Sequence, residues 1–197
     1  MYEISTYSFY SQRDLDMLHL PENAAERKAI RILNPISEDL AIMRTTLAPS
    51  MVNVIVRNLR RGNMEGKLFE QAKIYIADEL PIKTFPKEKE VIALGLWGKQ
   101  DFFDLKGIID CIAGVLNVKF EYAPTEKPYL HPGITAKILC DGVELGYAGM
   151  LSPEVADELA LDRFAYIAEI DYDELKKHAK PFKYSPISKF AEVTRDL

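Results

Sequence analysis

The run of strand-like segments constrains the fold of this 197-residue chain more than any other feature. Alternating apolar residues, or enrichment in β-branched and aromatic residues, predict strands over 2–10, 28–33, 67–77, 90–98, 118–122, 135–140, 143–150 and 164–172. Asp141-Gly142, between two of these segments, is a strong hairpin signal. Strands that follow one another with few helices between them pair antiparallel. The pattern therefore predicts an α+β domain, an antiparallel β-sheet flanked by helices, rather than a doubly wound parallel sheet.

The segments between the strands carry helical spacing and helix-end signals. Helices are predicted over 11–18, 49–61, 103–117, 152–159 and 173–179. For the helix predicted over 49–61, Pro49 suits a first helical position and Gly62 suits the residue after a helix ends. The helix over 103–117 has one apolar side, which indicates packing against the sheet. The residues on that side are Leu105, Ile109, Ile112 and Leu116.

Composition narrows the class of protein. Apolar residues make up 48% and charged residues 28%, as in ordinary globular proteins, and the net charge of −5 argues against a general nucleic-acid surface. Cys111 and Cys140 each lie in an apolar run, which favours buried free thiols in a reducing compartment. No signal peptide opens the chain and no apolar run approaches the ~20 residues of a membrane span, so a cytoplasmic protein without membrane contact is expected.

The residues alone reveal no reaction centre. The segment "NPISEDLAIMRTTLAP" (34–49) contains Glu38 and Asp39, but adjacent carboxylates point apart, so a turn is favoured over an acid/base pair. His19, His131 and His178 are scattered without zinc spacing, and His131 is interpreted as a turn residue. No phosphate-binding loop, dinucleotide fingerprint or nucleophile elbow is present. No catalytic, cofactor-binding or metal-binding residue is therefore predicted.

One local basic cluster stands at the end of the predicted helix 49–61. Arg57, Arg60 and Arg61 lie in or just after its last turns. They are either a solvated helix end or a place that contacts RNA phosphates, and both readings stay open.

Several blocks carry a resemblance to a known family. They are "NPISEDLAIMRTTLAPSMVNVIVRNLRRGN" followed by "KLFEQAKIY", then "DFFDLKG", "HPGITAKI", "GYAGMLSPEV" and the terminal "SKFAEVTRDL". In this order they cover nearly the whole chain and closely resemble the β subunit of bacterial-type phenylalanyl-tRNA synthetase. The resemblance implies a class II synthetase core over 1–183, the catalytic-like domain of that subunit. Residues 184–197 then look like the linker and truncated start of the anticodon-binding domain. The chain also begins and stops in strand-like material, so we expect a piece of a longer protein.

The resemblance also implies a role. In this family the α subunit activates phenylalanine with ATP and transfers it to tRNA, while the related β domain is non-catalytic and packs against it in an (αβ)₂ assembly. The implied partners are the α subunit and, in the full assembly, tRNA. ATP and magnesium serve the parent enzyme, and no cofactor is expected in this part. Editing and the family's magnesium-binding acidic segment belong to upstream regions.

One departure from the working class II pattern supports the expected inactivity of this part alone. An active site needs an Arg two positions before a Glu, in an F-R-x-E-like strand, to hold the α-phosphate of ATP. The aligned "KLFE" places Leu68 at the arginine and Glu70 at the glutamate. An aliphatic side chain cannot make a bidentate, charge-assisted contact with phosphate. The second ATP arginine has no recognisable counterpart.

The resemblance places helix 49–61 where class II proteins build their subunit interface. Its apolar stripe is too broad for packing on a sheet alone, and burying it would contribute roughly 7–15 kcal/mol before entropy costs. The predicted interface residues are Met51, Val52, Ile55, Val56 and Leu59, with Arg44 in a buried or interfacial ion pair. An uncovered stripe would also favour self-association of the isolated chain.

Two other functions remain as alternatives. One is a stand-alone class II synthetase-like paralogue that activates an amino acid through a rearranged site. The other is an RNA-binding module that uses Arg57, Arg60 and Arg61.

Overall fold

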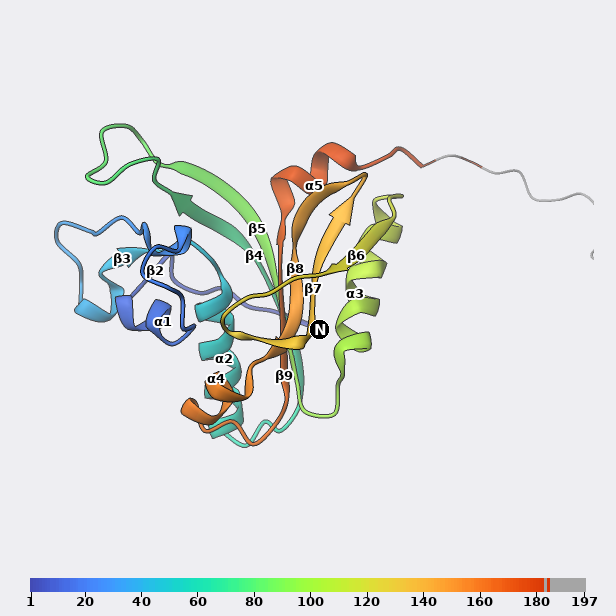
Figure 1. Ribbon diagram of the computed structural model, residues 1–197, viewed down its shortest axis with the longest axis horizontal. Coiled ribbons are helices and arrows are strands. Elements are labelled where there is room, and N and C mark those ends of the chain that lie inside the picture. Colours follow the sequence, from blue (N-terminus) through green and yellow to red (C-terminus); the bar gives the residue numbers. More distant parts are fainter. Residues whose placement is uncertain (183, 185–197) are drawn as a thin grey trace, which may run out of the picture.

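A seven-stranded sheet forms the centre of the molecule. The computed structural model describes residues 1–182 and 184, and its sheet has the strand order β1-β4-β5-β9-β8-β7-β6 (Figure 1). The strands are β1 (Tyr2–Glu3), β4 (Gly66–Ile76), β5 (Lys87–Trp97), β6 (Phe120–Pro124), β7 (Leu130–Cys140), β8 (Val143–Leu151) and β9 (Ala165–Asp171). Every neighbouring pair is antiparallel except β1 and β4, which are parallel. The sheet is therefore mixed, with one short parallel edge.

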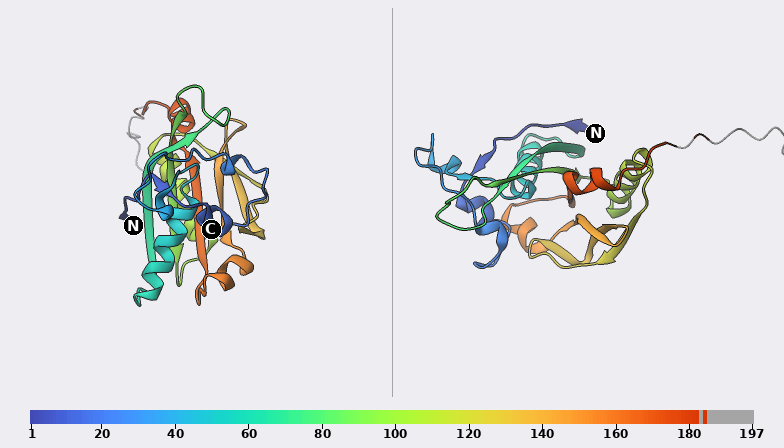
Figure 2. Two further views of the ribbon diagram at one scale, coloured as in Figure 1. Left: turned by 90° about the vertical axis from the view of Figure 1, so that its left-hand side faces the viewer. Right: turned by 90° about the horizontal axis from the view of Figure 1, so that it is seen from above.

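Helices cover both faces of the sheet, and each face has its own apolar core. Helices α1 (Gln12–Asp16), α2 (Ala48–Arg60) and α4 (Pro153–Glu158) contribute to one core, while α3 (Phe102–Val115) and α5 (Tyr172–His178) contribute to the other. The two layers lie on opposite sides of the strands (Figures 1 and 2). We call the two sides of the sheet the α2 face and the α3 face.

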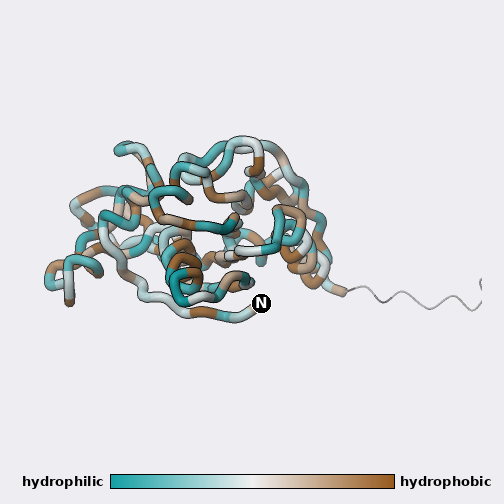
Figure 3. The backbone as a smooth tube through the Cα atoms, turned by 90° about the horizontal axis from the view of Figure 1, so that it is seen from below, coloured by the Kyte–Doolittle hydropathy of each residue, from teal (hydrophilic) through white to brown (hydrophobic). Residues whose placement is uncertain are grey.

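The sequence predicted most of these elements. The helix expected over 49–61 is α2, and the strands expected over 67–77 and 90–98 are β4 and β5, each displaced by three residues or fewer at the ends. Asp141 and Gly142 both have positive φ, at 50° and 80°, and close the hairpin between β7 and β8. Brown and teal alternate along α2 in Figure 3, as expected for a helix with one apolar side.

The N-terminal region differs from the prediction. The strand expected over 2–10 is broken, and only β1 and β2 (Phe9–Tyr10) are strands, because the Thr6 backbone N–H donates to the Glu70 carboxylate instead of a sheet partner. The strand expected over 28–33 is also wrong, since only Arg31 forms an isolated bridge, to Ile42. Strand β3 (Ile42–Met43), which was not predicted, pairs with β2 in a separate two-stranded sheet.

The apolar stripe of α2 lies inside the chain's own core. Met51, Val52, Ile55 and Val56 are each at most 5% exposed. Helix α2 approaches the sheet closely because Gly95 has no side chain, and a Cβ there would lie 2.5 Å from the Met51 sulfur. The sheet alone does not cover this stripe, as expected, but the N-terminal segment and α4 complete the cover, so the stripe is buried within the chain itself.

A second correction concerns the two thiols. Both cysteines are free, as predicted, but only Cys140 is buried, whereas Cys111 is exposed on α3. The apolar run "GIIDCIAGVL" covers all sides of that helix, so periodicity did not show which side faced the sheet.

A buried polar row as the candidate functional site

Polar residues lie opposite one another on neighbouring strands, in a row that crosses the sheet on its α2 face. Glu70 lies opposite Ala93, Ala93 opposite Glu169, and Glu169 opposite Tyr147, across β4, β5, β9 and β8. Residues opposite one another in a ladder share a face of the sheet. Two carboxylates and a phenol therefore face the interior, and we call Glu70, Glu169 and Tyr147 the polar row.

The segment just before α2 supplies the partners of this row. Arg44 Nη1 lies 3.2 Å from Glu70 Oε1. Two residues on, the Thr46 hydroxyl donates to Glu169 Oε2 at 2.7 Å, and the Leu47 backbone N–H donates to the same oxygen at 2.6 Å. The segment 34–49 is thus an approach to α2 that is tied to the sheet by its last residues.

The Arg44–Glu70 ion pair is buried, and both side chains make further hydrogen bonds. The two side chains are 4% and 3% exposed. Arg44 also donates from Nε to the Lys73 carbonyl at 2.8 Å, and from Nη1 to the Thr6 hydroxyl at 3.1 Å. Glu70 accepts further bonds from the Thr6 backbone N–H and hydroxyl at 2.9 and 2.8 Å. Of the buried or interfacial ion pair predicted for Arg44, the structure shows the buried one. Its partner was not predicted, because nothing in the sequence links positions 26 residues apart.

Leu68 lies in the apolar core of the α2 face rather than beside an open cleft. It is 7% exposed and sits opposite Gly95, against which Met51 packs. Two residues on, Glu70 is held by Arg44. The cation beside Glu70, Arg44, is therefore already engaged and is not available to a phosphate group.

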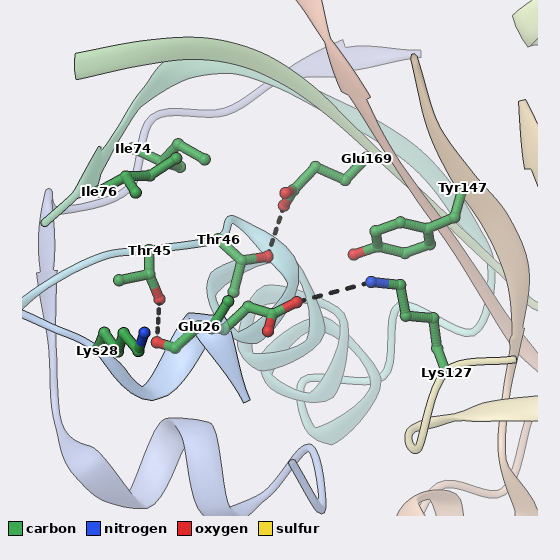
Figure 4. Close-up of a pocket in the computed structure, with 10 residues that line it drawn as sticks. Glu26, Lys28, Thr45, Thr46, Ile74, Ile76, Lys127, Tyr147 and Glu169 are labelled. Carbon is green, nitrogen blue, oxygen red and sulfur yellow. Dashed lines mark hydrogen bonds and ion pairs between the residues drawn. The ribbon is translucent and has the colours of Figure 1, made fainter. Parts of the chain in front are cut away.

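A cavity opens at the other end of the polar row (Figure 4). Its volume is about 220 Å³, and its walls come from β4, β8, β9, the 3-10 turn Ala25–Arg27 and the segment before α2. The lining residues used below are Glu26, Lys28, Ile74, Ile76, Lys127, Tyr147 and Glu169. Nothing in the sequence signals this cavity, because its residues are far apart in the chain and belong to no motif.

The charged groups of the cavity are unequally neutralised. Lys127 Nζ lies 3.6 Å from Glu26 Oε1 and 4.9 Å from the centre of the Tyr147 ring. Glu169 has no ion-pair partner within the part of the chain that the structure describes, and it receives hydrogen bonds only at Oε2 there. Removal from water raises the pKa of Glu169, although the bonds from Thr46 and Leu47 oppose that rise.

Tyr147 carries an unsatisfied hydroxyl. The residue is 7% exposed, and its hydroxyl is a buried polar atom without a hydrogen-bond partner among residues 1–182 and 184. The Thr46 and Tyr129 hydroxyls are nearby, but outside hydrogen-bond geometry. Burial raises the pKa of Tyr147, so the phenol is protonated at neutral pH. Buried polar atoms are rarely left without a partner. Figure 4 shows the hydroxyl pointing into the cavity.

The raised pKa of Glu169 predicts a pH dependence of stability. The folded state binds this proton more tightly than the unfolded state does, so its contribution is lost as pH rises from the ordinary value of 4.5 through the folded pKa. As pH rises across that window, the free energy of unfolding of wild type should fall relative to that of Glu169→Gln. Urea titrations at several pH values measure this difference. Glu121→Gln, at an exposed position, is the matched control. A difference that is flat or that grows with pH would contradict the expectation.

The other residues considered from sequence occupy structural positions. Glu38 and Asp39 are exposed in a 3-10 turn, and Glu38 pairs with Arg31 at 3.1 Å. His131 lies inside β7 rather than in a turn before a strand, so that interpretation was wrong, and its ring accepts from the Gly133 backbone N–H at 3.0 Å. His19 contacts Glu158 at 3.0 Å.

The three arginines at the end of α2 are all exposed. Within the described ranges, Arg57, Arg60 and Arg61 take part in no ion pair. Their contact with RNA phosphates stays a prediction.

One group of potential metal ligands was not expected from sequence spacing. Cys140, Asp141 and His178 bring ligand atoms within 4.8 Å of one another beside the β7–β8 turn. Burial raises the pKa of the Cys140 thiol, which disfavours the thiolate that binds metal, and Lys180 lies 3.8 Å from Asp141. Spacing did not reveal the group because the turn and α5 meet only in the folded chain.

The fold defines the class first. The chain superimposes on pyrrolysyl-tRNA synthetase from Desulfitobacterium hafniense with a TM-score of 0.66 and 13% identity, over 89% of this chain and 62% of that one. At that identity the likeness establishes a shared fold alone, an α+β domain of the kind found in an aminoacyl-tRNA synthetase.

The sequence defines the family. Residues 1–172 match the model of the phenylalanyl tRNA synthetase beta chain CLM domain, and the chain belongs to that family. Phenylalanine–tRNA ligase beta subunits of Clostridium acetobutylicum and Clostridium tetani are 39% and 36% identical over 99% and 98% of this chain. The chain spans about a quarter of the length of these relatives, 25% and 24%.

Proposed function

We propose that this chain is a non-catalytic, class II synthetase-like domain of a phenylalanine–tRNA ligase β subunit, and that it packs against the α subunit. The family match supports the subunit assignment. The observation that carries the loss of catalysis is the committed state of Glu70, whose carboxylate is bonded to Arg44 and Thr6. Transfer chemistry at phosphorus depends on positioned, available positive charge, and Arg44 is already used.

The assembly around this domain belongs to the same proposal. ATP, magnesium and tRNA would be used by the whole ligase, in the cytoplasm. Residues 1–183 would form the core domain and 184–197 the start of the next one, most of which lies outside the described residues. None of the helices in residues 1–182 is both long and apolar enough to cross a membrane.

We place the surface that meets the partner elsewhere than the sequence alone suggested. Met51, Val52, Ile55 and Val56 would fix the position of α2 rather than touch another chain. Leu59, which is only partly buried, is the stripe residue that still reaches the surface. Large exposed apolar residues elsewhere, among them Leu33, Ile36 and Phe85, would favour self-association of the isolated chain.

A mixing experiment tests the proposal. The purified chain should show no phenylalanine-dependent ATP–pyrophosphate exchange above an active-site-blocked control, and it should co-elute with the α subunit of the same organism on size exclusion. Leu59→Arg should weaken that association about tenfold or more, because a charge would enter the contact. Val115→Arg, at an exposed position on α3, is the matched control and should change nothing.

Two outcomes would count against this function. Exchange activity in the pure chain would favour the stand-alone paralogue. Separate elution of the two chains at micromolar concentrations would remove the scaffold role.

A further inference from the structure

The cavity at the end of the polar row has the attributes of a binding site that the scaffold role does not use. It lies on the α2 face, is bounded by several separate segments, and contains both apolar and charged walls (Figure 4). Its volume of about 220 Å³ is below the roughly 300–1,000 Å³ typical of sites for drug-sized ligands. An occupant would therefore be a small molecule.

Two groups with unused hydrogen-bonding capacity lie side by side on one wall of this cavity. Glu169 and Tyr147 are direct cross-strand neighbours on β9 and β8, so their side chains leave the sheet side by side on one face. The Tyr147 hydroxyl has no partner, and Glu169 receives its two hydrogen bonds at one oxygen only, within the described part of the chain. A donor with several N–H groups placed between them would satisfy both.

The charges select a cation for that position. Lys127 is paired with Glu26 and forms no ion pair with Glu169, on which it acts only as a more distant positive charge. A desolvated carboxylate without a cation attracts a positive group more strongly than a solvated one does. An anion at the same place would meet the Glu169 carboxylate and be repelled.

The remaining walls select the rest of the molecule. Figure 4 shows Ile74 and Ile76 on the side of the cavity away from Tyr147, where they offer an apolar surface. Lys28, which is exposed, lies at the rim. An alkyl group would bury apolar area against the isoleucines, and a carboxylate on the same molecule would be attracted by Lys28.

We propose that this cavity binds a small aliphatic primary amine. The ammonium group lies between the free oxygen of Glu169 and the Tyr147 hydroxyl, and the alkyl group lies against Ile74 and Ile76. A free monoamine and an aliphatic amino acid share this chemistry and differ in the carboxylate that Lys28 would attract. The proposal does not depend on the α subunit, so either can fail without the other.

Calorimetric titration of the chain with three probes of one shape tests the proposal. The probes are 3-methylbutylamine, leucine, and 3-methylbutanol, which lacks the charge. We expect the amine to bind with a roughly millimolar Kd, as suits a ligand of so few atoms. The alcohol should bind at least about tenfold more weakly, because it lacks the charge-assisted bond. Tighter binding of leucine than of the amine would identify the amino acid as the source, and weaker binding would identify the monoamine.

Variants assign the binding to the two residues. Glu169→Gln keeps an acceptor for Thr46 and Leu47 but removes the charge, and it should weaken amine binding at least about tenfold. Tyr147→Phe removes a hydroxyl that has no partner, so the chain should fold normally and bind about fivefold more weakly. Glu121→Gln, on the exposed side of β6, is the matched control and should bind as wild type does.

The proposal is overturned by any of three results. They are absence of binding by both the amine and leucine at ten-millimolar concentrations, equal binding of the alcohol and the amine, or undiminished amine binding in a folded Tyr147→Phe or Glu169→Gln variant.

Discussion

Arg44→Ala should lower the free energy of unfolding by about 3–5 kcal/mol, because it leaves the Glu70 carboxylate buried without its cation. The two side chains are 4% and 3% exposed, so water cannot replace the lost partner. The Lys73 carbonyl would also lose the bond from Arg44 Nε. Urea unfolding followed by circular dichroism measures the change.

The exposed pair Arg31–Glu38 provides the control. Its side chains are 66% and 78% exposed, so Arg31→Ala should cost no more than about 1 kcal/mol. The double variant Arg44→Met/Glu70→Leu should be more stable than the sum of its single changes by about 0.5–3 kcal/mol, since it removes both charges together. Strict additivity, or an effect of Arg44→Ala as small as that of Arg31→Ala, would show that the pair is not coupled.

Gly146→Ala should be the most damaging single methyl addition. A Cβ at this position of β8 would lie 2.0 Å from the Glu169 carbonyl oxygen, and the obstacle is backbone rather than a flexible side chain. The neighbouring strand would have to move, which we expect to cost about 3 kcal/mol or more. Because Gly146 pairs with β9 beside the polar row, the change should also disturb the cavity.

Gly107→Ala makes the same chemical change in open space. Nothing lies within 4 Å of a Cβ there. Gly107 is in the middle of α3, on the side exposed to solvent. Alanine should therefore raise stability by about 0.5–1 kcal/mol through helix propensity. Thermal or urea unfolding of the two variants side by side checks both signs. Equal effects would mean that the close contact at Gly146 is relieved without cost.

The elements with long, regular patterns could be predicted from sequence, and the short ones could not. Helix α2 between Pro49 and Gly62, and the hairpin at Asp141-Gly142, follow from local signals that need no tertiary partner. The segment over 28–33 has a strand-like pattern, yet only Arg31 forms a bridge, to Ile42. Its pairing depended on which neighbours the fold supplied, and local propensity does not contain that information.

The candidate site shows the same division more strongly. Sequence reasoning singled out Arg44 and Glu70 separately but did not pair them, and it passed over Glu169, Tyr147 and Lys127. These residues come together through the pairing register of the strands and through the contact of the segment before α2 with the sheet. Both exist only once the sheet has assembled. The stripe of α2 was read as an interface because the sequence does not say how much of the chain folds over it.

What the sequence determined by itself is the longer elements, the α+β class and the family, because periodicity, turn residues and matched blocks act locally along the chain. What only the tertiary structure decided is which polar groups are buried, which of them are satisfied, and which are left facing a cavity. Those outcomes depend on contacts between residues far apart in sequence, where desolvation and hydrogen-bond geometry set the energy.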